Sequence, residues 1–247
     1  SVMLIAGALI LDAWGWRTLW LISSGITVIW AGIVLKVTAG WRRRQSSDVS
    51  TSSMLNNLTK CLASPGALLV AGCFALYAAQ HISMMAWLPS YMREVYGSGT
   101  LVAATIPAIV LIFNAIGNWF SAWAMGRGMS CWALLAIGAI GMGLSQIGIF
   151  SAILPDTARL GFAIMFGIFG GMVPAAALGS VATYTPSPSQ IGTMNGLMVM
   201  GTNTGMLFGP PAAAAVRAST GNWHDVVWLM VSLAAVGFVL AILSRGR

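Results

Sequence analysis

Charged residues are scarce in this sequence. Only 7% of its 247 residues are Asp, Glu, Lys or Arg, whereas an ordinary soluble domain has about 25%. Hydrophobic residues make up 58% of the chain, and its mean hydropathy is +0.85. A soluble globule of this length could not cover its surface with 12 basic and 5 acidic side chains. The composition argues against a soluble enzyme, a nucleic-acid-binding protein and a disordered chain, and it predicts an integral membrane protein.

Cysteine is nearly absent as well. Cys61, Cys73 and Cys131 lie far apart, without a C-x-x-C pair or a Cys/His cluster, so the sequence predicts neither a disulfide framework nor a metal site. A G-x-x-x-x-G-K-[ST] phosphate loop is also missing, so direct driving by ATP has no support and we expect no cofactor. The chain opens at Ser1 on an apolar stretch without a basic leader, which is typical of a sequence that starts in mid-protein.

Long apolar runs dominate what is present. A helix needs about 20 mostly apolar residues to cross the hydrocarbon core. The runs are apolar on every face instead of alternating with polar residues, so they indicate helices and not the strands of a barrel. An eighth stretch, Val2 to Leu11, is too short to cross and resembles the stump of a severed helix. The seven predicted spans are 18–35, 66–90, 101–125, 131–154, 160–184, 191–216 and 224–243.

The connections between successive spans alternate between those with an excess of basic residues and those with equal numbers of basic and acidic residues. One set of connections holds four basic and four acidic residues, and the other set holds eight basic residues against Asp48. Because cytoplasmic loops are rich in Lys and Arg, the second set is predicted to face the cytoplasm, which also places the C-terminus there. Its basic residues are Lys36, Arg42, Arg43, Arg44, Lys60, Arg127, Arg245 and Arg247.

One connection is much longer than the others and divides the chain. It covers residues 36–65 and combines a run of three arginines with a Ser/Thr-rich stretch. We therefore predict three parts: 1–35 as the end of an N-terminal bundle, 36–65 as a cytoplasmic linker loop, and 66–247 as a C-terminal six-helix bundle. The arginine run could bind anionic lipid headgroups, but a solvated linker that determines topology is the favoured interpretation.

Two loop motifs carry a family resemblance. Gly15-Trp16-Arg17 resembles the turn that follows the fifth helix of major facilitator superfamily transporters, and 117–128 resembles the degenerate second copy of that family's G-x-x-x-D-R-x-G-R-R loop. Ser121 or Ala122 stands near the position of the motif's Asp, so only Arg127 carries over. The resemblance covers essentially all of the chain, aligned to the C-terminal two-thirds of such a transporter.

The resemblance implies a fold, a location and a function. The fold class is an all-α polytopic membrane protein, with seven full spans plus the stump and an incomplete N-terminal bundle. The implied function is secondary active transport of a small solute by alternating access in the cytoplasmic (inner) membrane, with the missing N-terminal helices as partners. The stretches 170–175 and 192–211 look like a subgroup that is grouped with cyanate and nitroimidazole transporters.

Polar side chains within the spans are the candidates for a solute cavity, because a polar group in hydrocarbon needs a partner or water. Gln80 and His81 are the most polar pair near the middle of a span, and in the family the corresponding helix lines the central cavity. His81 is the intramembrane candidate for carrying a proton; whether it faces solute or only bonds a neighbouring helix stays open. For the asparagines, packing is favoured over solute contact. The cavity candidates are Tyr77, Gln80, His81, Trp87, Asn114, Asn118 and Asn203.

Glycines and prolines recur at helical spacing in two spans. Small residues four apart allow helix backbones to approach closely, and proline permits a kink. This pattern predicts tight packing, and it is also compatible with surfaces that slide during alternating access. The residues are Gly170, Gly171, Pro174, Gly201, Gly205, Gly209 and Pro210.

Two alternatives to a transporter remain. A truncated fragment would lack one wall of the cavity and would not transport. A membrane-embedded enzyme would need positioned acid–base groups, and His81 is the only ionisable side chain clearly inside a span, without a carboxylate neighbour. The sequence thus argues against an enzyme.

Overall fold

The structure, a computed structural model, describes residues 2–39, 51–97, 99–151, 153–185 and 187–246. Within these ranges the regular elements are helices, and no strand occurs among them. The elements are α1 (Val2–Thr38), α2 (Thr51–Leu62), α3 (Pro65–Tyr96), α4 (Thr100–Gly126), α5 (Cys131–Ile149), α6 (Asp156–Gly179), α7 (Val181–Tyr184), η2 (Pro188–Gln190), α8 (Ile191–Thr220), η3 (Trp223–Asp225), α9 (Val226–Leu243) and η4 (Ser244–Gly246).

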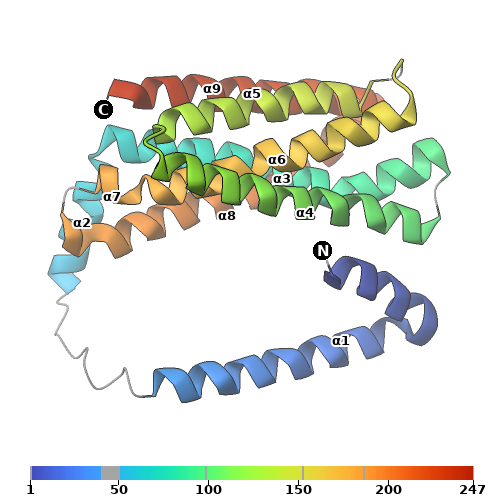
Figure 1. Cartoon of the computed structure of the whole chain (residues 1–247), viewed down its shortest axis with the longest axis horizontal. Coiled ribbons are helices and arrows are strands. Elements are labelled where there is room, and N and C mark those ends of the chain that lie inside the picture. Colours follow the sequence, from blue (N-terminus) through green and yellow to red (C-terminus); the bar gives the residue numbers. More distant parts are fainter. Residues whose placement is uncertain (1, 40–50, 98, 152, 186, 247) are drawn as a thin grey trace.

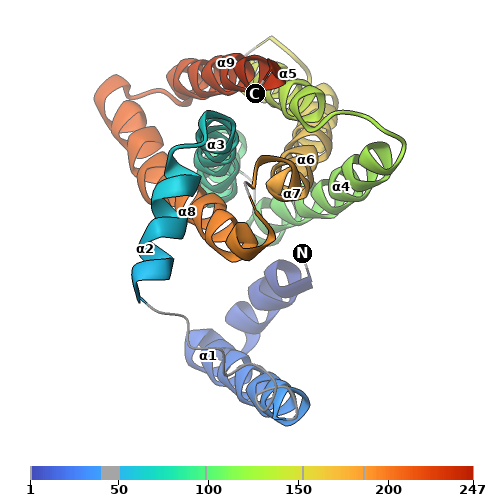
Figure 2. The same ribbon diagram turned by 90° about the vertical axis from the view of Figure 1, so that its left-hand side faces the viewer.

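The long helices from α3 onward form one bundle (Figure 1). Figure 2 looks along these helices and shows α3 in the interior, with α4, α6, α5, α9 and α8 arranged around it. The closest pairs are α4 with α6, α3 with α8, and α5 with α6. Helix α1 lies beside the bundle and approaches it at α4. The bundle therefore encloses α3, the helix that carries most of the cavity candidates.

Six described helices are long and apolar enough to cross a membrane, whereas the sequence predicts seven spans. The predicted span that is not among these six is 191–216, which lies in α8, a helix of 30 residues. Its Thr, Asn and Gly content makes it less apolar than the other long helices. It nevertheless packs along α3 through its glycines, while Asn195, Asn203 and Thr204 are exposed.

Several helix boundaries differ from those expected. Helix α3 continues to Tyr96 and ends at Gly97, whose left-handed backbone (φ 61°) stops it, so Arg93 and Glu94 belong to the helix and not to a loop. Helix α5 ends at Ile149, five residues before the predicted boundary. The predicted stump is helical and joins the first span through Gly15, whose φ of 76° bends α1.

The segment predicted as a linker loop contains a helix. Helix α2 occupies its C-terminal part, and Cys61 of α2 is fully buried. An interhelical hydrogen bond joins the segment to η2, where Gln190 Nε2 donates to Asn57 Oδ1 at 3.3 Å. The arginine run lies outside the described residues. The described part of this segment thus packs against the bundle.

Glycines of α8 face alanines of α3 along what we call the α3–α8 seam. A Cβ on Gly201 would lie 2.7 Å from the carbonyl oxygen of Ala71, and a Cβ on Gly205 would overlap that of Ala75. Such contacts show that the two backbones touch and leave no room for a side chain. The seam consists of Gly201, Gly205 and Gly209 of α8 and Ala71, Ala75 and Ala79 of α3.

Helices α4 and α6 meet in a similar way. A Cβ on Gly171 would overlap the carbonyl oxygen of Asn114, and a Cβ on Gly117 would overlap that of Ile168. Pro174 lies inside α6 one turn after Gly170. Gly170 itself is buried but does not touch the α4 backbone, because its missing side chain points toward the side chains of Asn114, Tyr77 and His81.

Candidate functional site

A series of stacked rings joins α3 to α6. Phe74, Tyr77 and His81 recur at intervals of three and four residues, which places them on one face of α3. Ring centroids are 5.9 Å apart for Phe74–Tyr77 and 5.3 Å for Tyr77–His81. His81 also stacks on Phe166 of α6, at 6.0 Å with planes only 7° apart. The imidazole is therefore in contact with two aromatic rings, and His81 is only 6% exposed.

Two buried nitrogen atoms beside this series have no hydrogen-bond partner among the described residues. They are His81 Nδ1 and Asn114 Nδ2. Asn114 also interacts with the Tyr77 phenol, without forming a hydrogen bond of normal geometry. Its other side-chain atom, Oδ1, accepts from Asn118 Nδ2 at 3.4 Å. A buried polar atom without a partner is rare in proteins, and Gln146 Oε1 is another such atom among the described residues of this bundle.

Gly170 is the α6 residue that lies beside these two nitrogens. The position that a Cβ would take on Gly170 is 3.5 Å from Asn114 Nδ2, 3.6 Å from Tyr77 Cε2 and 3.7 Å from His81 Nδ1. These are ordinary van der Waals separations, so a methyl group would fit there without a clash. We call Tyr77, His81, Asn114 and Gly170 the His81 cluster.

Gln80 does not join the His81 cluster. Its Oε1 accepts from Gln146 Nε2 of α5 at 2.8 Å, and its Nε2 donates to the carbonyl oxygen of Leu76 at 3.1 Å. Gln80 is 2% exposed and Gln146 is fully buried. Gln80 precedes His81 by one residue, about 100° around the helix, so it points toward a different neighbour. The pair acts as an interhelical hydrogen bond between α3 and α5.

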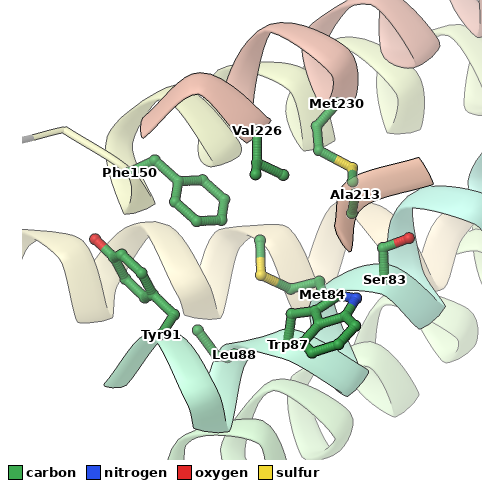
Figure 3. A pocket seen from close by; sticks show the side chains of 9 residues that line it. All are labelled: Ser83, Met84, Trp87, Leu88, Tyr91, Phe150, Ala213, Val226 and Met230. Carbon is green, nitrogen blue, oxygen red and sulfur yellow. The ribbon is translucent and has the colours of Figure 1, made fainter. Parts of the chain in front are cut away.

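Trp87 lies farther along α3, at a cavity near one end of the bundle. Its Nε1 donates to the carbonyl oxygen of Pro210 at 3.0 Å, so the proline-containing part of α8 is tied to α3. Apolar side chains such as Met84, Phe150 and Met230 line most of the cavity (Figure 3). A second small cavity adjoins Tyr77 and Gln80. Each has room for about one water molecule, so neither is large enough for a solute.

A polar contact that the sequence did not predict joins α3 to the C-terminal end of α8. Glu94 Oε2 accepts from Trp223 Nε1 at 2.7 Å and from Arg217 at 3.2 Å. The Arg217 guanidinium also lies over the Trp223 ring, 5.5 Å from its centroid. Sequence could not reveal this contact, because Glu94 is more than 120 residues from both partners and only the packing of α3 on α8 brings them together.

The remaining candidates lie outside the His81 cluster. Asn203 is exposed on α8. Arg127 is exposed after α4, with its guanidinium 4.8 Å from the centroid of the Trp123 ring. Arg245 makes a similar contact with Trp132, at 5.0 Å. Arg–Trp pairs at helix ends suit the membrane–water interface, since the ring is partly apolar and the guanidinium stays hydrated.

This chain is similar to a known transport protein and to a known protein family. A "Probable nitrate/nitrite antiporter NarK1" from Thermus thermophilus is 25% identical over 176 residues, which are 64% of this chain and 39% of the relative. The chain thus spans about two fifths of the length of this relative. The sequence profile of the Major Facilitator Superfamily matches residues 1–166, more than half of the chain. With its apolar helices and bundle architecture, the chain belongs to the Major Facilitator Superfamily.

Proposed function

We propose that this chain is part of a secondary transporter that moves a small solute across a membrane by alternating access. Membership of a transporter family supports the general function. The observation that carries the solute site is the His81 cluster, where two buried nitrogens lack partners. Burying such an atom unpaired costs about 1–3 kcal/mol, which a solute that bonds it would offset. The solute is proposed to contact Tyr77, His81 and Asn114.

The second wall of the solute pathway is proposed to come from further helices of the same protein. The spanning part of α1 is exposed along its length, including Trp14, Trp20 and Trp30. Side chains of this kind need lipid or other helices around them. We propose that 1–35 belongs to such an N-terminal bundle and that 66–247 forms the C-terminal one. The α3–α8 seam lies within the C-terminal bundle, and it would keep these two helices in contact while that bundle rocks against the N-terminal one.

Transport is tested in liposomes with the protein expressed from its complete gene. Nitrate and nitrite are among the first solutes to assay, because the relative named above is called a nitrate/nitrite antiporter; uncharged polar solutes complete the panel. For the solute that is transported, His81→Ala should raise KM at least about tenfold, since about 1.4 kcal/mol of binding energy corresponds to that factor. The measurement is initial uptake and counterflow.

Ser232→Ala is the matched control, because Ser232 is exposed on α9 and its hydroxyl bonds only the carbonyl oxygen of Trp228 on the same helix. It should transport at the native rate. Native KM and rate in His81→Ala would show that the proposed site is wrong.

The narrower part of the proposal is that transport is coupled to protons through His81. The groups that face its ring are Tyr77, Phe166, Asn114 and Gly170, and none of them is charged. Under this proposal, solute uptake by liposomes that contain a pH-sensitive dye changes the internal pH, and His81→Gln abolishes that change. Equal proton movement in native protein and His81→Gln would contradict coupling at this residue.

We further propose that the C-terminus faces the cytoplasm of the inner membrane. In a cysteine-free background, Ser219→Cys should react with an impermeant maleimide on intact cells. Ser130→Cys should react only after permeabilisation. Both positions are exposed, and they lie at opposite ends of the bundle, in the last turn of α8 and directly before α5 (Figure 1). The reverse labelling pattern would overturn this orientation.

A further inference from the structure

Arg245 presents a guanidinium group without an acidic partner at one end of the bundle. Its Cζ lies 5.0 Å from the centroid of the Trp132 ring, and Arg245 is exposed whereas Trp132 is half-buried. The preceding residue, Ser244, is buried, and its carbonyl oxygen accepts from the Tyr184 hydroxyl at 3.0 Å. Among the residues that the structure describes, no ion pair involves Arg245. The backbone and the ring contact therefore hold the guanidinium in place, and its N–H groups are available to an anion.

The opposite end of the bundle shows how an Arg–Trp pair of this kind binds an anion. There the Arg217 guanidinium lies 5.5 Å from the centroid of the Trp223 ring. Both side chains donate to Glu94 Oε2, Arg217 at 3.2 Å and Trp223 at 2.7 Å. The acidic residues after position 50 are Glu94, Asp156 and Asp225, and all three lie at this end, away from η4 (Figure 1). A carboxylate of the protein thus fills the anion position at one end, and none of these three can fill it at Arg245.

Exposed apolar side chains continue from the Arg245–Trp132 pair along two helices. Helix α5 begins beside Trp132, α9 ends beside Arg245, and the two helices pack against each other. Each has exposed apolar residues at positions i, i+3 and i+7, which share one helical face. From Trp132 to Leu144 this surface is about 18 Å long at 1.5 Å per residue, enough to cover one leaflet, which is half of the roughly 30 Å hydrocarbon core. The residues are Ile137, Ile140 and Leu144 of α5 and Val236, Val239 and Leu243 of α9.

This α5–α9 face lies on the side of the bundle away from α1. Figure 2 shows α5 and α9 on one side and α1 on the other, and α1 approaches the bundle at α4. Helices that join α1 on its own side would therefore leave the α5–α9 face uncovered. The occupant that fits combines an anionic group for Arg245 with a long apolar part for the two helices, and a phospholipid has both.

We propose that Arg245, Trp132 and the α5–α9 face bind an anionic phospholipid, with its phosphate on the guanidinium and one acyl chain along the two helices. Arginine suits this role because its planar fork of N–H groups matches a phosphate. A zwitterionic headgroup fits less well, because its own cation would be repelled by the basic residues at this end, which include Lys60 and Arg127 (Figure 1). The proposal does not depend on which solute the protein transports.

The test compares phosphatidylglycerol with phosphatidylcholine of the same acyl chains. The protein is expressed from its complete gene, delipidated in detergent and titrated with each lipid, and native mass spectrometry gives the Kd of the first bound lipid. Phosphatidylglycerol should bind more tightly than phosphatidylcholine. Arg245→Gln should weaken phosphatidylglycerol binding about fivefold, the factor that corresponds to about 1 kcal/mol for one basic residue at an anionic lipid surface. Trp132→Leu should weaken it as well, because the guanidinium loses the ring that positions it.

Lys60→Gln is the matched control. It removes one positive charge from the same end of the protein, but Lys60 is exposed on α2, which packs on α8 and α3. It should leave the affinity for phosphatidylglycerol unchanged. Arg245 is exposed, so Arg245→Gln should elute as native protein in size-exclusion chromatography and decides the test even if Trp132→Leu does not fold.

Four results would overturn the inference. Equal affinity of the native protein for the two lipids would show that it does not select an anionic headgroup. Native affinity of Arg245→Gln for phosphatidylglycerol would show that Arg245 does not hold the phosphate. An equal loss in Lys60→Gln and Arg245→Gln would indicate general attraction to basic residues and no local site. Displacement of phosphatidylglycerol by excess inorganic phosphate would identify a site for a free anion instead of a lipid.

Discussion

Replacing Gly205 with leucine is expected to separate α3 from α8 and to destabilise the bundle by about 3 kcal/mol or more, the upper part of the range for overpacked interiors. A Cβ on Gly205 would overlap the carbonyl oxygen of Ala75. That obstacle is backbone, so no rotamer change relieves it and the two helices must move apart. The rest of the α3–α8 seam would then lose its contacts too.

The effect is measured as the free energy of unfolding in an SDS titration of detergent-solubilised protein, with size-exclusion chromatography as a check on folding. Gly196→Leu is the control on the same helix, since Gly196 is exposed and has open space around it. It should change stability by no more than about 0.5 kcal/mol. Equal stability of the Gly205 and Gly196 variants would mean that the seam does not hold the helices together.

The second large effect is expected at the buried pair of glutamines. Gln80→Leu removes the acceptor of Gln146 Nε2, and Gln146 Oε1 already lacks a partner among the described residues. The whole amide of Gln146 would then be buried without a hydrogen bond, at a cost of about 1–3 kcal/mol. Gln146→Leu should cost less, because Gln80 Nε2 would keep its bond to the carbonyl oxygen of Leu76.

A double-mutant cycle measures this asymmetry. The variant with leucine at both positions should recover most of the stability lost in Gln80→Leu, because replacing both partners with apolar groups leaves no unpaired polar atom. The free energy of unfolding of the four proteins gives the coupling. Additive losses in the double variant would show that the two side chains do not depend on each other.

The membrane class and most of the helices could be predicted because they follow from local composition. Apolar runs of the right length marked the helices now seen as α3 to α6 and α9. The boundary at Gly97 was less predictable, because a charged pair such as Arg93 and Glu94 is equally common in a loop. Helix α8 was predicted as a span from its length and pattern, although its Thr, Asn and Gly content leaves it outside the clearly apolar helices.

Which polar residue faces which neighbour could not be predicted in the same way. Gln80 and His81 are adjacent in sequence and equally central in α3, yet Gln80 bonds to α5 whereas His81 meets α6 and lies beside Asn114 of α4. Likewise Gly170 and Gly171 look equivalent in the sequence, but one borders the His81 cluster and the other contacts the α4 backbone. A turn of 100° per residue separates such neighbours, and helical spacing gives no information on which helix lies in each direction.

The sequence alone determined that this is a helical membrane protein with few charges, and that its family resemblance is to major facilitator transporters. These conclusions depend on the cost of transferring each residue into hydrocarbon, which is a sum over local segments. Only the tertiary structure decided that His81 Nδ1 and Asn114 Nδ2 meet at Gly170 without partners. Such a convergence depends on the rotation and approach of three helices, which no single segment encodes; close glycine contacts set the approach of α4 and α6.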